Sequence, residues 1–165
     1  MKGAIFMSSK LSKSAEKIQS VLNKFGYELN VLELSGSTRT SQEAADTIGC
    51  SVGQIAKSLI FKGKVSNKPI LIIASGANRV NEKVIKKYVG EKIQRPDADF
   101  VLKETGFAIG GIPPIGHKDN ITTLIDEDLT KYEEIWAAAG TPHAVFKLTP
   151  QILKDITQGK IISIK

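Results

Sequence analysis

Cysteine, histidine and long apolar runs are all scarce in this sequence. Cys50 is the single cysteine, so no disulfide can form within the chain, and we expect a reducing, cytoplasmic setting. One thiol with only His117 and His143 is too small a ligand set for a structural zinc site, and we expect neither metal nor cofactor. The apolar patch at residues 4–7 is shorter than a signal-peptide core, and no run approaches the length of a membrane span.

Strong compositional bias is also absent. The 165 residues are 41% hydrophobic and 24% charged, which argues against a disordered or fibrous chain. A chain of this length buries roughly 70% of the surface that its unfolded form exposes, so it can fold as one domain. We expect that domain to span residues 1–165, with a core from about residue 14. The net charge of +6 favours a polyanionic partner.

Helical and strand patterns are interleaved along the chain. Apolar residues three and four positions apart predict a helix over residues 14–25, and Thr40 with Glu43 forms a capping-box pattern for a helix that Gly49 ends. Further helices are expected at residues 52–56, 84–89, 97–105 and 150–156. Strands are expected at residues 31–34, 57–62, 70–74, 93–95, 122–125, 135–138, 144–148 and 161–164. This order predicts one α/β domain with a mixed sheet.

The most unusual segment is the loop of residues 110–117, with the sequence Gly-Gly-Ile-Pro-Pro-Ile-Gly-His. Glycines permit close approach to the backbone, whereas prolines restrict the backbone conformation. Such a loop can hold several amides around an oxygen that gains negative charge, namely those of Gly111, Ile112, Ile115 and Gly116. A tight structural crossover is the alternative, and the histidine at the end of the loop favours a functional role.

His117, His143 and Lys57 are candidates for single roles at a site. Either histidine can orient a hydroxyl or a water as a neutral imidazole, or can brace the constrained turn in which it lies. Lys57 stands where a short predicted helix gives way to a strand. It can supply a point charge for a phosphate, or it can be a solvated lysine at the end of an element.

A helix-turn-helix is a competing interpretation. Ala45, Gly49 and Ile55 have the spacing of that motif, and a basic chain suits DNA binding. Against it, Gly53 lies inside the supposed recognition helix, and the residues after Ile55 alternate like a strand.

Four blocks of sequence taken together resemble one family. The blocks are residues 40–45, 54–61, 74–80 and 110–117, followed in order by 124–126 and 139–146. They closely resemble the YbaK/EbsC family of aminoacyl-tRNA editing deacylases, which is related to the editing domain inserted in bacterial prolyl-tRNA synthetases. The resemblance implies a free-standing α/β domain whose curled, partly barrel-like mixed sheet is surrounded by helices.

The resemblance also implies where the site residues lie. The family's essential lysine falls on Lys57, its glycine-rich loop falls on residues 110–116, and His143 resembles the histidine of the synthetase-embedded relatives. The Pro113-Pro114 pair and His117 depart from the cysteine-specific branch, which leaves the amino acid specificity open. We expect as catalytic residues Lys57, Gly110, Gly111 and His117. We expect as substrate-binding residues Thr40, Ser58, Ser75, Asn78, Pro113, Pro114, Gly116, Gly140 and His143.

The activity implied by the resemblance is hydrolysis of the ester in a mischarged tRNA, with a tRNA for proline and a small noncognate amino acid as the expected substrate. Water is the expected attacker, because no nucleophile motif is present. Lys57 is expected to anchor the end of the tRNA, and the 110–117 loop to stabilise the oxyanion. The expected partners are the acceptor end of aminoacyl-tRNA and a prolyl-tRNA synthetase, without a membrane. A non-catalytic tRNA-binding module is an open alternative.

Overall fold

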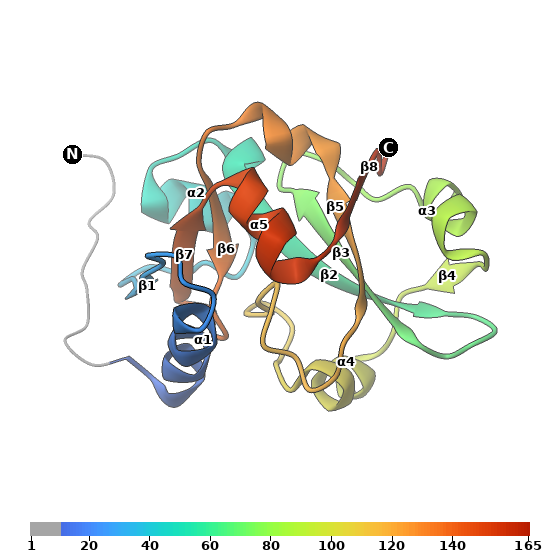
Figure 1. The fold of residues 1–165 in the computed structure, drawn as a ribbon, viewed down its shortest axis with the longest axis horizontal. Coiled ribbons are helices and arrows are strands. Elements are labelled where there is room, and N and C mark those ends of the chain that lie inside the picture. Colours follow the sequence, from blue (N-terminus) through green and yellow to red (C-terminus); the bar gives the residue numbers. More distant parts are fainter. Residues whose placement is uncertain (1–10) are drawn as a thin grey trace.

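The computed structural model describes residues 11–165, so the apolar patch at residues 4–7 lies outside the described part (Figure 1). None of the described helices is long and apolar enough to cross a membrane. The elements follow the order α1 (Lys13–Asn23), β1 (Val31–Glu33), α2 (Ser41–Ile48), η1 (Val52–Gln54), β2 (Ile55–Gly63), β3 (Pro69–Ser75), α3 (Glu82–Val89), β4 (Ile93–Gln94), α4 (Ala98–Thr105), β5 (Thr122–Asp126), η2 (Glu127–Lys131), β6 (Ile135–Ala138), β7 (Ala144–Leu148), α5 (Pro150–Thr157) and β8 (Lys160–Ile162).

All of these strands belong to one mixed sheet, as the sequence predicts. The strand order is β1-β7-β6-β2-β3-β5-β8, and β4 pairs with β2. The β2–β6, β3–β5 and β5–β8 pairs are parallel, and the other pairs are antiparallel. No ladder joins β1 to β8 within residues 11–165, so the barrel-like part of the expectation does not extend to closure.

The central strand β3 is apolar along its length because both of its faces are buried. Leu71 and Ile73 point into the larger core cluster, which also holds the inner faces of α1 and α5. Ile70 and Ile72 point into a second cluster with Ile85 of α3. Since side chains alternate along a strand, the sheet has helices on both faces, as in other α/β domains.

Helix α2 begins and ends as predicted, with one difference. The Thr40 hydroxyl oxygen accepts the Glu43 N–H at 3.1 Å, and Gly49 ends the helix at a φ of 86°. The Glu43 carboxylate, however, accepts a hydrogen bond from the Ser37 hydroxyl at 2.7 Å. The glutamate therefore ties α2 to the preceding loop, which carries part of the site described below.

The helix predicted at residues 52–56 is wrong. Residues 52–54 form a single turn of 3-10 helix, and β2 begins at Ile55. The physical reason is tertiary pairing, because Ala56 is held between Ser75 of β3 and Ala137 of β6. A helix-turn-helix needs a recognition helix where β2 runs, so this structure excludes the helix-turn-helix alternative.

Candidate active site

A cavity of about 350 Å³ opens beside the middle of β2. It lies between the start of α2, the segment before α4, the 110–117 loop and β6, and most of its walls are apolar. The lining residues that carry polar or charged side chains are Thr38, Arg39, Thr40, Ser41, Lys57, Ser58 and Arg95. Apolar walls with a few polar groups are typical of a small-molecule site.

The cavity occupies a gap along one edge of β2. Pairing with β6 ends at Ala56, and pairing with β4 begins only at Lys62. Between these two points β2 is paired with β3 alone within the described residues. The β4 pairing cannot extend further toward the cavity because Pro96 has no N–H to donate.

Ser58 and Ile60 present backbone groups to this gap. The Ile55 carbonyl accepts the Gly76 N–H at 2.8 Å, which sets the alternation by which every second residue of β2 bonds to β3. It follows that the N–H and C=O groups of Ser58 and Ile60 point away from β3, toward the open edge. An occupant of the cavity can therefore use two backbone donors and two backbone acceptors.

Three buried hydroxyl groups in this cavity have no partner. The unpartnered oxygens belong to Thr38, Ser41 and Ser58, and these are the only such buried side-chain atoms within residues 11–165. All three residues line the cavity, and Thr38 and Ser58 are only 6% and 8% exposed. A buried hydroxyl without a partner costs about 1–3 kcal/mol. A cavity that gathers all three is suited to a ligand with hydrogen-bonding groups.

The charges at the cavity are all of one sign. Arg39, Lys57 and Arg95 line it, and no carboxylate does so among the residues that the structure describes. Lys57 is exposed at the third position of β2, and Arg95 lies with Cζ 5.6 Å from the centre of the Phe61 ring. This excess of positive charge favours an anionic ligand such as a phosphate ester.

The 110–117 loop contributes to the cavity only through its first residues. Gly110 and Ile112 line the cavity, and Gly110 has a φ of 102° that favours glycine. The Gly111 N–H is directed to the Ala108 carbonyl at 3.3 Å, and a Cβ on Gly111 would lie 2.7 Å from the Thr141 backbone. Gly111 is therefore a packing residue in this structure.

The remainder of the loop lies under α1, away from the cavity lining. A Cβ on Gly116 would lie 2.8 Å from Ile18 of α1, and Pro113, Pro114 and Ile115 are buried. The sequence predicts that the amides of Gly111, Ile112, Ile115 and Gly116 surround one oxygen. In the structure only Ile112 of these four residues lines the cavity.

His117 braces this loop. Its Nε2 lies 2.7 Å from the Pro113 carbonyl oxygen, which can only accept, so Nε2 carries the proton. Burial lowers the pKa of His117 below its ordinary value of 6.5, and the nearby Lys17 charge lowers it further, against the opposing effect of the Pro113 bond. The ring is therefore a neutral donor at neutral pH, and it does not line the cavity.

The turn of residues 140–143, which contains His143, is hydrogen-bonded to the loop that precedes α2. The Pro142 carbonyl accepts the Thr38 N–H at 2.6 Å, and the His143 carbonyl accepts the Leu34 N–H at 2.8 Å. The His143 ring also lies 3.0 Å, through Nδ1, from the Gly36 carbonyl oxygen. His143 and its turn thus position Thr38 in the cavity from outside the lining.

Residues 35–156 match the aminoacyl-tRNA editing domain family. The chain belongs to this family. It is therefore an enzyme of the class that removes amino acids from aminoacyl-tRNA. A solved structure of a candidate trans-editing enzyme for prolyl-tRNA synthetase is similar to this editing domain, with a TM-score of 0.89 at 42% identity over 94% of this chain and 99% of that one.

Two curated proteins are also similar to the editing domain. YwhH of Bacillus subtilis is 30% identical over 148 residues, which are 90% of this chain and 94% of YwhH. EbsC of Enterococcus faecalis, a candidate Cys-tRNA(Pro)/Cys-tRNA(Cys) deacylase, is 25% identical over 126 residues, which are 76% of each chain.

Ser75 and Asn78 lie in a different part of the editing domain. The Ser75 hydroxyl donates to the Gly53 carbonyl at 2.7 Å, and Asn78 donates to the carboxylates of Asp126 and Asp128 at 2.9 and 2.7 Å. The bonds of Asp128 to Lys165, Asn78 and Lys131 hold the pKa of its carboxyl far below the ordinary range. This network joins β3 to η2, and neither Ser75 nor Asn78 lines the cavity.

The structure thus divides the expected site residues of the editing domain into two sets. Four of them line the cavity, namely Thr40, Lys57, Ser58 and Gly110. The others lie outside the lining, namely Gly111, Pro113, Pro114, Gly116, His117, Gly140, His143, Ser75 and Asn78. Sequence reasoning missed the lining residues Thr38, Arg39, Ser41 and Arg95. Arg39 and Ser41 are direct neighbours of the expected Thr40, and Arg95 directly precedes Pro96. These positions next to Thr40 and Pro96 were the only signals in the sequence that could have identified them.

Proposed function

We propose that this editing domain hydrolyses the ester of a mischarged tRNA in trans, with a tRNA for proline and a small noncognate amino acid as its substrate. The observation that carries the proposal is the cavity, where three unpartnered hydroxyls and three cations meet an open strand edge. An aminoacylated adenosine offers the complementary groups, which are ribose hydroxyls, an ester carbonyl, an ammonium and a phosphate. The assignment to proline is supported by the similar solved structure.

Lys57 anchors the tRNA end in this proposal. Its ammonium is exposed at the edge of the cavity, and an ammonium is a suitable point charge for the phosphate of the terminal adenosine. Arg39 and Arg95 add to the positive field around the same opening. With the phosphate held at the opening, the ribose and the ester that it carries extend into the cavity.

Hydrolysis proceeds by attack of a water oxygen on the ester carbonyl carbon. The new C–O bond moves the carbonyl electrons onto oxygen, and the amides of Gly110, Ile112, Ser58 and Ile60 are available to stabilise that oxyanion. A well-placed donor of this kind contributes about 3 kcal/mol. Collapse of the intermediate breaks the bond to the ribose oxygen, which takes the proton from the attacking water. The free ribose hydroxyl beside the ester positions that water.

The α-ammonium of the substrate is held by neutral oxygens in this proposal. No carboxylate lines the cavity among the described residues, so the acceptors are the Ser58 and Ile60 carbonyls and the three unpartnered hydroxyls. The apolar walls then select the side chain by size. One methylene is worth about 1–3 kcal/mol in such a pocket, which favours small amino acids.

The test is a panel of tRNAs for proline charged with alanine, serine, cysteine, threonine or proline, with the rate of ester loss measured for each. We expect at least one small noncognate amino acid to be released at least tenfold faster than proline. A panel in which all esters decay at the buffer rate would reject the hydrolytic function. In that case retained tRNA binding would identify the non-catalytic tRNA-binding module instead.

A further inference from the structure

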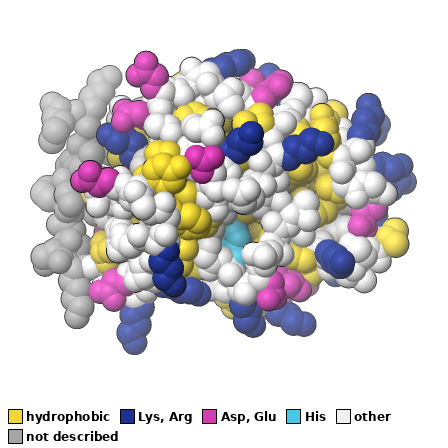
Figure 2. Space-filling view, viewed as in Figure 1, with side chains coloured by type: hydrophobic (Ala, Val, Ile, Leu, Met, Phe, Trp, Pro, Cys, Tyr) yellow, Lys and Arg dark blue, Asp and Glu magenta, His cyan; other side chains and the backbone are white. Residues whose placement is uncertain are grey.

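The excess positive charge of the chain lies in one segment, and most of it lies outside the cavity. Residues 62–95 contain nine lysines and arginines against two glutamates, so this segment accounts for the net charge of +6 and the rest of the chain is close to neutral. The segment runs from the end of β2 through β3 and α3 to β4, and its hairpin tip, α3 and β4 lie at the end opposite α1 and β1 (Figure 1). Dark blue side chains gather at this end in Figure 2.

Five lysines at this end form one shallow groove. The groove is lined by Lys64, Lys83, Lys86, Lys87 and Lys92, with Glu82 as the single acidic lining residue, and its volume is about 720 Å³. All five lysines are exposed. None of them takes part in an ion pair within residues 11–165, where the ion-paired lysines are Lys131, Lys147 and Lys165. The charge of the groove is therefore available to a partner.

Hydrogen bonds join the segments that form the groove. The Lys64 N–H donates to the Lys92 carbonyl at 2.8 Å, which joins the hairpin to β4. The Glu91 carboxylate accepts the N–H groups of Val65 and Ser66 at 2.8 and 3.0 Å, and the bonds from Ser66 contribute most to lowering the pKa of Glu91. This glutamate is thus used to hold the hairpin tip, and it does not pair with the lysines of the groove.

The groove and the cavity lie beside the same strand, β2, at different points along it. β2 runs from Lys57 at the cavity to the hairpin beside the groove, and Lys64 follows Lys57 by seven residues, or roughly 23 Å at the rise of a strand. Lys92 and Arg95 flank β4, and Lys92 lines the groove whereas Arg95 lines the cavity. A polyanion whose end enters the cavity therefore has a basic path along β2 and β4.

We propose that this lysine groove binds the phosphates of the double-helical acceptor stem while the aminoacylated end occupies the cavity. The proposal rests on the proposed function, because that function places the end of a tRNA in the cavity. Ammonium groups contact phosphates as point charges and read no base edges, so the groove contributes affinity without sequence preference. Each phosphate contact releases counterions, so its contribution decreases as salt increases.

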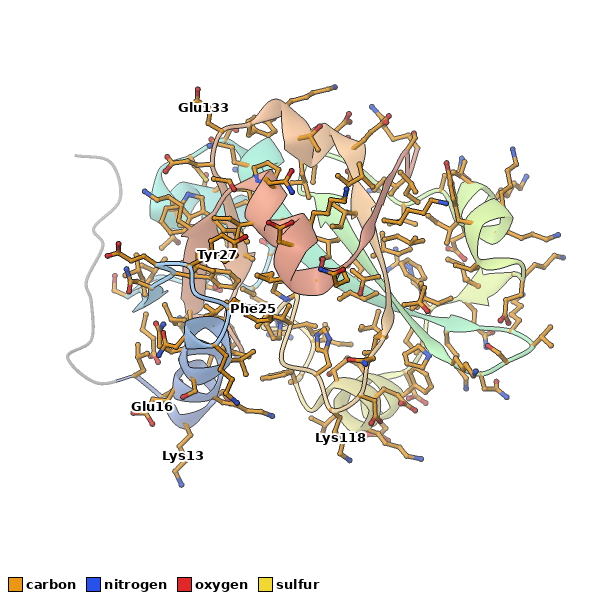
Figure 3. All side chains as sticks on the ribbon, viewed as in Figure 1. Lys13, Glu16, Phe25, Tyr27, Lys118 and Glu133 are labelled. Atoms are coloured by element: carbon orange, nitrogen blue, oxygen red, sulfur yellow. The ribbon has the colours of Figure 1, made fainter. Side chains whose placement is uncertain are left out.

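The test compares two triple variants that each remove three positive charges. The groove variant is Lys83→Gln/Lys86→Gln/Lys87→Gln, and the control is Lys13→Gln/Lys24→Gln/Lys154→Gln. The control lysines are exposed on or beside α1 and α5, and Figure 3 shows Lys13 far from α3. The affinity for uncharged tRNA is measured over a salt series, with circular dichroism to check that each variant folds.

We expect the groove variant to bind at least about tenfold more weakly than wild type at low salt, with a salt slope smaller by roughly two. The control should stay within about twofold. Equal losses in both variants would overturn the proposal, because they would show a general charge effect. An unchanged affinity in the groove variant would overturn it as well.

A second measurement separates the groove from the chemistry. With charged tRNA, the groove variant should lose about tenfold in kcat/KM, whereas its rate on an aminoacylated trinucleotide without a stem should equal that of wild type. A matching loss on the trinucleotide would overturn the proposal. If wild type hydrolyses neither substrate, the proposed function fails, and the binding of uncharged tRNA still decides whether the groove holds the stem.

Discussion

Among single residues, Thr38 and Ser58 are the most informative about the site, because each buries a hydroxyl that nothing in the described chain satisfies. For Thr38→Val we expect an increase of about 1 kcal/mol in the free energy of unfolding, since the change removes an unpaired polar atom at constant shape. We expect kcat/KM to decrease about tenfold in the same variant. Urea unfolding and deacylation kinetics measure the two effects. Loss of stability together with activity would show that the hydroxyl serves the fold.

Lys57 can be tested without touching the core, because its side chain is exposed. We expect Lys57→Ala to abolish deacylation while the circular dichroism spectrum stays that of wild type, since the change removes the anchor for the tRNA end. Lys154→Ala, which removes an exposed lysine of α5, is the matched control and should keep full activity. Turnover of Lys57→Ala near the wild-type rate on every mischarged tRNA would remove Lys57 from the mechanism.

The depressed pKa of His117 predicts how stability changes with pH. A histidine whose pKa in the folded protein lies below 6.5 binds a proton more readily when the chain unfolds, so its contribution is present above pH 6.5 and is lost as the pH falls below it. We expect the unfolding free energy of wild type to decrease more between pH 7.5 and 5 than that of His117→Gln, which cannot titrate. Parallel pH profiles in urea unfolding would contradict this role.

At the scale of elements, the turn of residues 140–143 and the start of the 110–117 loop depend on each other. Gly140 donates its N–H to the Gly111 carbonyl at 2.9 Å, and there is no room for a Cβ on Gly111 against the Thr141 backbone. We expect Gly111→Ala to cost at least about 2 kcal/mol of stability and most of the activity.

The control is Gly26→Ala, which has a φ of 80° but open space around its Cβ. It should cost only about 1–2 kcal/mol and leave kcat/KM unchanged. If the two variants are equally stable, the contact between the two loops does not hold the site together. Thermal unfolding and deacylation rates distinguish these outcomes.

The sequence predicts most elements because their signals are local. The β6 and β7 strands are found at the predicted bounds, and α4 is preceded by Asp97, whose carboxylate accepts the Phe100 N–H at 2.8 Å. The η1 segment was predicted wrongly and η2 was not predicted. In η1, pairing of β2 on both edges overrides a local helical pattern, and η2 is a short turn whose residues carry no periodic signal.

The site is less predictable because it arises from sheet pairing. Lys57 and Gly110 were expected together, and both line the cavity. The open edge at Ser58 and Ile60 exists only because β6 stops pairing at Ala56 and Pro96 prevents β4 from extending. No local pattern in the sequence encodes this register. For the same reason His117 and His143 could be recognised as unusual, but their structural roles could not be separated from contact with a ligand.

At the scale of the whole molecule, three cations, three unpartnered hydroxyl groups and the open edge of β2 come together in one cavity. We therefore expect the isolated protein to hydrolyse free mischarged tRNA, with a kcat that changes by less than about twofold when prolyl-tRNA synthetase is added. The synthetase at stoichiometric concentration, inactivated so that it cannot recharge the tRNA, is the partner for this measurement. A kcat that increases tenfold or more on addition would show that the synthetase completes the active site.

The short length of the gap in β2 also affects how copies of the protein behave toward one another. A free strand edge is ordinarily a hazard, because a strand from another molecule can add to it and seed a fibril. Here the unpaired stretch is bounded by the β6 pairing at Ala56 and by the β4 pairing at Lys62, so it is too short for a long strand to add to it. A small ligand can still reach the same backbone donors and acceptors. The open edge therefore suits ligand binding but not strand addition between copies of the protein.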